Sequence, residues 1–295
     1  MMKYVITGSI GHISKEIVVG LIKNGKQVSV ITSSHDRVKE IESLGAKALV
    51  GALEDQSFVK KAYAGAEVVY TMSPPIWVTD NWRASQNVQY KSMTESIIAN
   101  KVKYVVNLSS IGAEHKDGCG PVNGIHDFEV MLNAIPELNV KHLRPAYFFH
   151  NFLAQIGMIK GAGIMGGNFG GSDQKLLLTA YHDIAVAAVE ELLSLNFKGT
   201  SHRYIVSDIR TTADVTKVLG AAVAKELPWI VFTDKDQAAG MLQAGLAPEI
   251  VKGYVEMGKA LREGLMQTDV LNHLPPLGSI KLESFAKEFA AAFYA

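Results

Sequence analysis

Short apolar runs and amphipathic stretches alternate along the first half of the chain. The first apolar run, 3–7, is rich in β-branched residues and leads through a glycine turn into a stretch, 15–23, whose apolar positions recur at helical spacing. Gly25 ends that stretch, and a second apolar run follows at 27–32. Continuous apolar runs are typical of parallel strands that are buried on both faces. The pattern therefore predicts a strand–helix–strand unit at the amino terminus.

The same alternation continues beyond this unit. The pattern predicts further strands at 47–50, 67–73, 103–110 and 140–145, and helices at 38–44, 57–64, 83–100 and near 126–132. Strands that alternate with helices are typical of a doubly wound parallel sheet, so we expect an α/β fold of the Rossmann type. From Thr211 onward the pattern is mainly helical. A chain of 295 residues can hold a second, smaller unit of this kind beside the sheet.

The glycine turn after the first strand is the first candidate for chemistry. It reads Gly8-Ser-Ile-Gly-His-Ile-Ser14. A helix that begins there directs unpaired N–H groups and its positive dipole end at one point, where an anion is favoured. Gly8 allows a sharp turn, and Gly11 lacks the Cβ that would hold a pyrophosphate away from the backbone. The spacing is not Gly-x-Gly-x-x-Gly, yet its context favours a dinucleotide site over an incidental glycine turn. The predicted cofactor contacts here are Gly8, Ser9, Ile10, Gly11, His12 and Ile13.

The end of the second predicted strand bears on the choice between NADP and NAD. An acidic residue there would bind the ribose hydroxyls and repel a 2′-phosphate, and none stands at 30–32. Ser33, Ser34 and Arg37 offer hydroxyls and a cation, which favours NADP, with NAD possible. The alternative for Arg37 is a solvated charge at a helix end. Residues that follow other strands line the crevice of such folds. We expect the adenine and ribose to contact Leu53, Glu54, Met72, Ser73 and Pro74.

An aromatic cluster follows the predicted strand at 140–145, in the run Ala146-Tyr-Phe-Phe-His-Asn151. Aromatic side chains at a strand end offer flat surfaces for a nicotinamide or a substrate ring. We expect Tyr147, together with Ser109, beside the nicotinamide. The predicted substrate contacts are Phe148, Phe149 and Asn151. Core packing is the alternative for the two phenylalanines.

These elements suggest a division of the chain into two parts. Residues 1–150 would form the NAD(P)-binding Rossmann domain, with 176–208 completing its sheet. Residues 151–175 and 209–295 would form a smaller, mainly helical domain that closes the crevice on the substrate side.

Composition and charge make several function classes unfavourable. Lysine plus arginine and aspartate plus glutamate both total 29, so no charge excess attracts nucleic acid or an anionic membrane. The single cysteine, Cys119, excludes an internal disulfide framework and suits a reducing cytoplasm. No Cys/His cluster has zinc-site spacing, so no metal is expected. We recognise no signal peptide, and the most apolar later stretch, 147–165, carries too many polar residues to span a bilayer.

Six motifs resemble the NmrA-like group of atypical short-chain dehydrogenases/reductases, in order and along nearly the whole chain. They are 7–14, 51–55, 69–75, 107–113, 143–152 and 182–185. The resemblance implies a Rossmann domain that binds NAD(P) and a small substrate domain. It also implies one of two roles, because some relatives reduce quinones or other small electrophiles and others bind the dinucleotide as redox sensors.

The chain departs from the superfamily at the usual catalytic pair. Reductases of the superfamily commonly place a tyrosine and a lysine four residues apart, and no Tyr-x-x-x-Lys lies between Ser109 and Arg144. The predicted helix there carries His126, Asp127 and Glu129 instead. The proton would then come from water or from His126, whose ordinary pKa suits that role. The alternative for His126 is a helix-surface or capping histidine. The catalytic candidates are His126 and Ser109.

Two functions therefore remain in view. The first is an NADPH-dependent reductase of a quinone-like or other small conjugated electrophile, which accepts hydride without a strong acid at its carbonyl. The second is a non-catalytic dinucleotide sensor whose carboxyl-terminal lobe binds a protein partner. An isomerase or epimerase is a weaker third possibility, since the missing tyrosine–lysine pair disfavours it as well.

Overall fold

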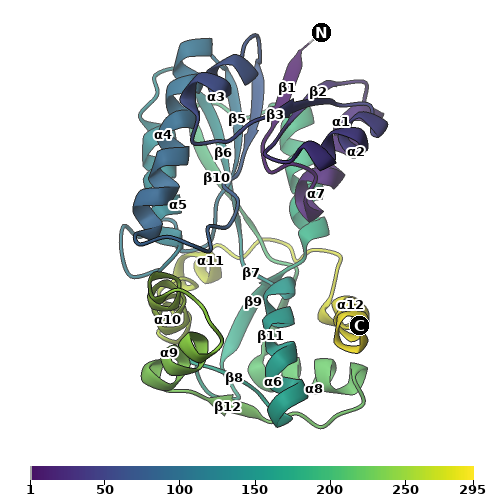
Figure 1. The fold of residues 1–295 in the computed structure, drawn as a ribbon, viewed down its shortest axis with the longest axis vertical. Helices are drawn as coiled ribbons and strands as arrows, with labels where there is room; N and C mark the ends of the chain where they lie inside the picture. Colours follow the sequence, from purple (N-terminus) through teal and green to yellow (C-terminus); the bar gives the residue numbers. More distant parts are fainter. Residues whose placement is uncertain (1) are drawn as a thin grey trace.

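The structure is a computed structural model that describes residues 2–295 and has two lobes (Figure 1). The upper lobe is built on one seven-stranded sheet in the order β10-β6-β5-β4-β1-β2-β3, with every pair of neighbours parallel. The strands are β1 (Lys3–Ile6), β2 (Gln27–Thr32), β3 (Lys47–Val50), β4 (Val68–Thr71), β5 (Tyr104–Leu108), β6 (Asn139–Pro145) and β10 (Thr200–Ile205). The predicted doubly wound Rossmann sheet is confirmed.

Helices cover both faces of this sheet. One face carries α1 (His12–Lys23), α2 (Val38–Ser43) and α7 (Tyr181–Ser194), and the other carries α3 (Gln56–Ala62), α4 (Trp82–Asn100) and α5 (Val122–Asn133). Successive residues of β1 show why the runs are continuously apolar. Tyr4 and Ile6 pack under α1 and α7, whereas Val5 packs under α3 and α4. Because both faces of β1 are buried, polar residues do not alternate with apolar residues along the strand.

The lower lobe contains helices and two small sheets. Its helices are α6 (Ile156–Ala162), α8 (Thr212–Ala222), α9 (Asp234–Gln243), α10 (Pro248–Arg262), α11 (Thr268–Asn272) and α12 (Leu282–Tyr294), with 3-10 helix η2 at Phe149–Gln155. One sheet has the order β11-β9-β7 and the other pairs β12 with β8. These strands are β7 (Tyr147–Phe148), β8 (Met165–Gly167), β9 (Lys175–Thr179), β11 (Asp208–Thr211) and β12 (Trp229–Val231). A single apolar core joins these elements except α9, which has no buried residue.

The segment 176–208 divides between the lobes. Within it, β10 completes the large sheet and α7 covers one face, but β9 pairs with β7 and β11 in the lower lobe. The chain therefore crosses between lobes next to the carboxyl ends of the large sheet (Figure 1). This crossing brings lower-lobe side chains to the edge where a Rossmann fold binds its ligands.

Candidate functional site

The turn after β1 bends sharply at two residues. Gly8 has a φ of 88° and Ser9 a φ of 55°, both in the left-handed region. A Cβ on Gly8 would lie 2.6 Å from the Met72 sulfur and 2.8 Å from the Ser14 hydroxyl, so the position requires glycine. Ser14 is buried, and its hydroxyl donates to the Thr7 carbonyl at 3.2 Å. The Ser14 hydroxyl thus fixes the turn against the end of β1.

The amino terminus of α1 is open to a ligand. Gly11 is the N-cap residue, and no side chain caps the helix. A Cβ on Gly11 would meet only the Gly8 carbonyl oxygen, at 3.5 Å, so one side of this residue faces open space. His12 is exposed here, whereas Ile10 is buried and offers backbone alone. Free N–H groups, a helix dipole and an open approach fit the diphosphate of a dinucleotide.

An aromatic stack links this turn to the lower lobe. The His12 ring centroid lies 5.4 Å from that of Tyr181, and Tyr181 stacks on His150 at 3.9 Å. Burial lowers the pKa of His150, and the Nδ1 atom of this residue is buried without a hydrogen-bond partner. No local pattern in the sequence predicts this contact, because Tyr181 and His150 come from separate elements, α7 and η2.

Two cations flank one carboxylate near the end of β2. Glu40 accepts from Lys15 at 2.9 Å and from Arg37 at 3.4 Å, and the hydrogen bond from Lys15 lowers the Glu40 pKa. Both cationic side chains are about half exposed, at 49% and 53%. Ser33 is exposed, whereas the Ser34 hydroxyl accepts from the Asp36 N–H and caps η1 (His35–Arg37). The structure thus adds Lys15 to the cations that could meet a 2′-phosphate.

The residues predicted around the adenine and ribose occupy different environments. Leu53 is buried in the core beneath α3 and α4. The Glu54 carboxylate accepts from the Gln89 amide, and the Gln89 carbonyl oxygen accepts from the Ser73 hydroxyl. This chain of hydrogen bonds holds the ends of two loops against α4. Glu54 and Ser73 therefore have defined positions on the crevice side of the sheet.

A cavity of about 360 Å³ lies between the lobes, next to the glycine turn. Met72 connects the two, since it lines the cavity and its backbone N–H donates to Thr7 at 2.7 Å. Of the residues predicted for cofactor or substrate, the wall includes Met72, Ser73, Pro74, Ser109, Tyr147, Phe148 and Asn151. The wall of a larger cleft of about 780 Å³, beside Pro275–Ser279, includes none of the residues predicted for cofactor or substrate. The smaller cavity is therefore the candidate site.

The cavity wall is aromatic and uncharged. Among the described residues that line it there is no aspartate, glutamate, lysine, arginine or histidine. Burial raises the pKa of Tyr147, Tyr181 and Tyr254, and the nearness of Tyr254 raises the pKa of the other two further. These phenols therefore stay protonated and can donate hydrogen bonds to a ligand.

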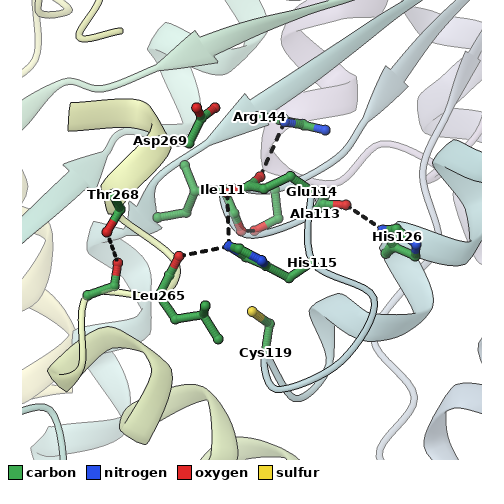
Figure 2. Close-up of polar contacts among 12 residues, drawn as sticks. Ile111, Ala113, Glu114, His115, Cys119, His126, Arg144, Leu265, Thr268 and Asp269 are labelled. Carbon is green, nitrogen blue, oxygen red and sulfur yellow. Dashed lines mark hydrogen bonds and ion pairs between the residues drawn. The ribbon is translucent and has the colours of Figure 1, made fainter. Parts of the chain in front are cut away.

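Ser109 is held by a buried ion pair. Its hydroxyl donates to Glu129, and Arg144 donates to both oxygens of that carboxylate, at 3.0 and 2.7 Å. Burial alone would raise the Glu129 pKa, but the hydrogen bonds from Arg144 and Ser109 and the charges of His142 and Arg144 together outweigh it, and the pKa is lowered. Arg144 also donates to Glu114 at 3.2 Å (Figure 2). Ser109 therefore has a fixed position at the cavity floor with its proton directed away from the cavity.

His126 lies away from the cavity. Its Nδ1 atom is 2.8 Å from the carbonyl oxygen of Ala113, in the loop after β5, and Figure 2 shows the ring directed at that loop. His126 does not line the cavity. The neighbouring Asp127 accepts from Arg83 at 2.7 and 2.6 Å, which ties α5 to α4. A catalytic role for His126 stays a prediction, and its observed contact ties α5 to the loop after β5.

The aromatic cluster at 147–152 divides between core and cavity. Phe148 and Asn151 line the cavity. Phe149 is 1% exposed and stacks on Phe285 of α12 at 5.7 Å, so it belongs to the lower-lobe core and not to the cavity wall. The prediction of Phe149 as a substrate contact is therefore replaced by the core alternative. Phe148 ends the extended β7 and Phe149 begins η2, so the backbone conformation changes between these two residues.

Sequence reasoning missed the outer wall of the cavity. Trp77 precedes α4, Trp82 begins it, and Tyr254, Met257 and Leu261 come from α10. Aromatic spacing on α4 resembled ordinary core packing, and α10 lies far along the chain. Only the long-range docking of the two lobes brings these residues together.

The described residues were compared with the requirements of a metal site and of a membrane-spanning helix, and they meet neither. Across 2–295 no group of three or more His, Cys, Asp or Glu side chains could hold a metal ion. Over the same range no helix has the length and apolar character needed to cross a bilayer. Cys119 is buried, and burial raises its pKa to about 12. Its thiol therefore stays protonated and unreactive at neutral pH.

Comparison with known proteins agrees with this geometry. Residues 8–135 match a family described as NAD(P)H-binding, so this part of the chain is an NAD(P)H-binding domain. One characterised protein, the 4-hydroxy-2-methyl-3-oxo-4-farnesyl-3,4-dihydroquinoline-1-oxide ketoreductase of Stigmatella aurantiaca, is 26% identical over 69 residues. That match covers 23% of this chain and only 21% of the ketoreductase.

Solved structures resemble the whole chain. An NADPH-dependent quinone oxidoreductase from Escherichia coli, in complex with NADPH, has a TM-score of 0.80 at 19% identity and covers 97% of this chain and 99% of its own. The triphenylmethane reductase of Citrobacter sp. with NADP(H) has a TM-score of 0.81 at 18% identity, with the same coverages of 97% and 99%. A nucleoside-diphosphate-sugar epimerase from Staphylococcus aureus has a TM-score of 0.79 at 13% identity and covers 97% of this chain and 100% of its own. At these identities the likeness shows a shared fold.

Proposed function

We propose that the chain is an NADPH-dependent reductase of a quinone-like or other small conjugated electrophile. The observation that carries this proposal is the uncharged aromatic cavity that adjoins the glycine turn. A charged substrate would lose its hydration there without gaining an ionic partner. A flat, neutral, apolar acceptor would bury its surface against the rings at no such cost.

The residues present fit the cofactor. NADPH, when bound, supplies the hydride. The N–H groups at Gly11 to Ile13 would hold the diphosphate, and Arg37 and Lys15 would hold the 2′-phosphate. Met72, Ser109 and Tyr147 line the cavity next to that turn and would contact the nicotinamide end.

The side chains around the cavity can bind and orient an acceptor but supply no strong acid. The protonated phenols of Tyr147 and Tyr254 can donate hydrogen bonds to a carbonyl oxygen, which stabilises charge that develops on it. A quinone-like acceptor needs no more than this, because its reduced anion is delocalised and takes its proton from water. Two proteins with this fold are named as an NADPH-dependent quinone oxidoreductase and a triphenylmethane reductase, and these names are consistent with the proposal.

The proposal predicts NADPH consumption in the presence of quinones. The purified protein with menadione or toluquinone should consume NADPH, as followed by absorbance, well above the rate without protein. A simple aliphatic ketone should give no activity, since it needs an acid that the cavity does not provide. NADPH binding without consumption for any quinone or enone would refute a reductase role.

Arg37→Ala should weaken NADPH binding about tenfold and change NADH binding less than twofold, because only NADPH carries the 2′-phosphate. Calorimetric titration with each cofactor measures both constants. Lys39→Ala is the matched control, since Lys39 is an exposed cation two residues away. Equal losses of affinity for both cofactors would mean that Arg37 instead supports the fold through its contact with Glu40.

A dinucleotide sensor is the second candidate, and one observation favours it. Ser109 directs its proton to Glu129, so the hydroxyl nearest the expected nicotinamide does not face the cavity as a donor. A sensor would bind NADPH and then retain a protein partner through the lower lobe. Affinity capture with and without NADPH that recovers no partner would count against this candidate.

Three finer statements belong to the same proposal. We infer that the chain is NmrA-like on the motifs quoted above. We infer a cytoplasmic location from its single, buried and protonated thiol, which suits a reducing compartment. The partner of the site would be a small molecule in the reductase and a protein in the sensor.

A further inference from the structure

Tyr181 stands where the chain crosses from the lower lobe to the upper one. It is the first residue of α7, which covers the large sheet, and it follows β9, a strand of the lower lobe that ends at Thr179. Tyr181 lines the cavity between the lobes and is partly exposed. Both lobes therefore determine where this side chain lies.

The lower lobe fixes the orientation of the Tyr181 ring. His150 of η2 stacks on it, with the ring centroids 3.9 Å apart and the planes within 12° of parallel. Phe148 of β7 lies at 5.3 Å and nearly perpendicular to it, at 76°. His150 in turn contacts α12, through Glu288 at 3.2 Å and the Phe285 ring at 5.1 Å. Because close-packed rings have little freedom to turn, these contacts set the direction of the phenol.

The glycine turn approaches the same ring from the upper lobe. His12 follows the N-cap residue Gly11, and its ring centroid lies 5.4 Å from that of Tyr181. The centroid of His12 is also 5.4 Å from that of His150, so His12 lies beside the stack of the other two rings and not across it. Tyr181 thus adjoins both the candidate diphosphate site and the cavity.

A dinucleotide bound at the turn has to pass this point. In the sheet, β1 lies between β2 and β4. A diphosphate at the end of β1 therefore separates an adenosine half beside β2 from a nicotinamide half beside β4 and β5. Met72 and Ser109 follow β4 and β5 and line the cavity. The ribose that joins the diphosphate to the nicotinamide would accordingly lie between the turn and the cavity, where Tyr181 stands.

We propose that Tyr181 is a positioning residue for the nicotinamide riboside half of NADPH, to whose ribose its hydroxyl donates a hydrogen bond. This inference rests on the cofactor placement in the proposed function. Burial and the nearness of Tyr254 raise the pKa of Tyr181, so the hydroxyl stays protonated and can donate. Because His150 and Phe148 hold the ring, the lower lobe takes part in cofactor binding.

The test compares NADPH with adenosine 2′,5′-bisphosphate, a fragment that carries the adenosine and the 2′-phosphate but no nicotinamide riboside. Tyr181→Leu removes the hydroxyl and the flat ring. It should raise the Kd for NADPH about tenfold and that for the fragment less than twofold. Tyr181→Phe keeps the stack and loses only the hydroxyl, so the Kd for NADPH should rise about threefold. Calorimetric titration measures each constant.

His182→Leu is the matched control for the start of α7. His182 is the next residue of that helix, is exposed and does not line the cavity, so its replacement should leave both constants unchanged. Equal losses for NADPH and the fragment in the Tyr181 variants would mean that the ring only supports the glycine turn through His12. That result, or unchanged NADPH affinity in both variants, would overturn the positioning role.

These binding constants separate the inference from the proposed function, because they need no turnover. A selective loss of NADPH affinity in a protein that never reduces a quinone would retain the positioning role and refute the reductase. Turnover of menadione by the unmodified protein, with NADPH affinity insensitive to Tyr181, would retain the reductase and refute the positioning role. A rise in the KM for menadione alone would place Tyr181 against the acceptor and refute it as well.

Discussion

Gly11→Val should weaken NADPH binding about a hundredfold and leave the fold intact. Gly11 has an ordinary φ of −65°, and an added Cβ would be in normal contact with the Gly8 carbonyl oxygen at 3.5 Å. The new methyl groups would extend into the open space at the start of α1, where the diphosphate must approach the backbone N–H groups. A loss of about a hundredfold in affinity is expected from the blocked anion contact. Calorimetric titration with NADPH measures it, and a thermal melt without cofactor checks the fold.

A second glycine shows whether the effect belongs to the site. Gly157→Val changes a position on α6 where nothing lies within 4 Å of an added Cβ, far from the turn. It should reduce stability slightly and leave NADPH affinity unchanged. If Gly11→Val bound NADPH as tightly as the unmodified protein, the glycine turn would not be the diphosphate site.

Gly8 illustrates how a sequence motif and a structural requirement can differ. The sequence assigned both glycines to the cofactor, Gly8 because it allows a sharp turn and Gly11 because it lacks a Cβ. In the structure Gly8 is required by its φ of 88° and by contacts with Met72 and Ser14, which are internal to the protein. Gly11 alone has free space beside it. A local motif shows that a glycine matters, but the neighbours that decide the reason come from distant parts of the chain.

The elements of the large sheet could be predicted because each follows from local pattern. Strands at 27–32 and 47–50 agree with β2 and β3 at both ends, since glycine and polar residues beside each run mark its limits. The short strands of the lower lobe carry no such signal. β7 and β12 have two and three residues, which are too few to show a repeating hydrophobic pattern. These strands form only through pairing with distant segments.

The site was predictable on its cofactor side and not on its substrate side. Rossmann topology places the ends of β1, β4 and β5 together, so Met72, Ser73 and Ser109 could be assigned to one crevice. No topological rule places α10 over that crevice. Trp77 and Tyr254 meet because Gly120 and Gly253 permit the close docking of the two lobes, and neither glycine stands in a recognisable motif.

The pair formed by Glu129 and Arg144 is the strongest polar contact beneath this site. The two residues are 4% and 8% exposed, and two hydrogen bonds join them. The sequence noted Glu129 only as one of the polar residues on the helix that lacks the tyrosine–lysine pair. Its carboxylate instead accepts from Ser109 and from Arg144, so it connects α5 with the ends of β5 and β6. A charge at this depth is tolerated only while its partner remains.

Arg144→Met should therefore destabilise the protein by about 3–5 kcal/mol, because it leaves the Glu129 carboxylate buried without its cation. Urea unfolding, followed by circular dichroism, measures the change in the free energy of unfolding. The double variant Arg144→Met, Glu129→Gln removes the charge as well and should recover at least half of the loss, since no unpaired ion remains. Arg203→Met serves as the control, because its ion pairs with Glu190 and Glu191 are at the surface and should be worth under about 1 kcal/mol. Additive losses in the double variant would mean that the two side chains stabilise the fold separately, and that Ser109 does not depend on the pair for its position.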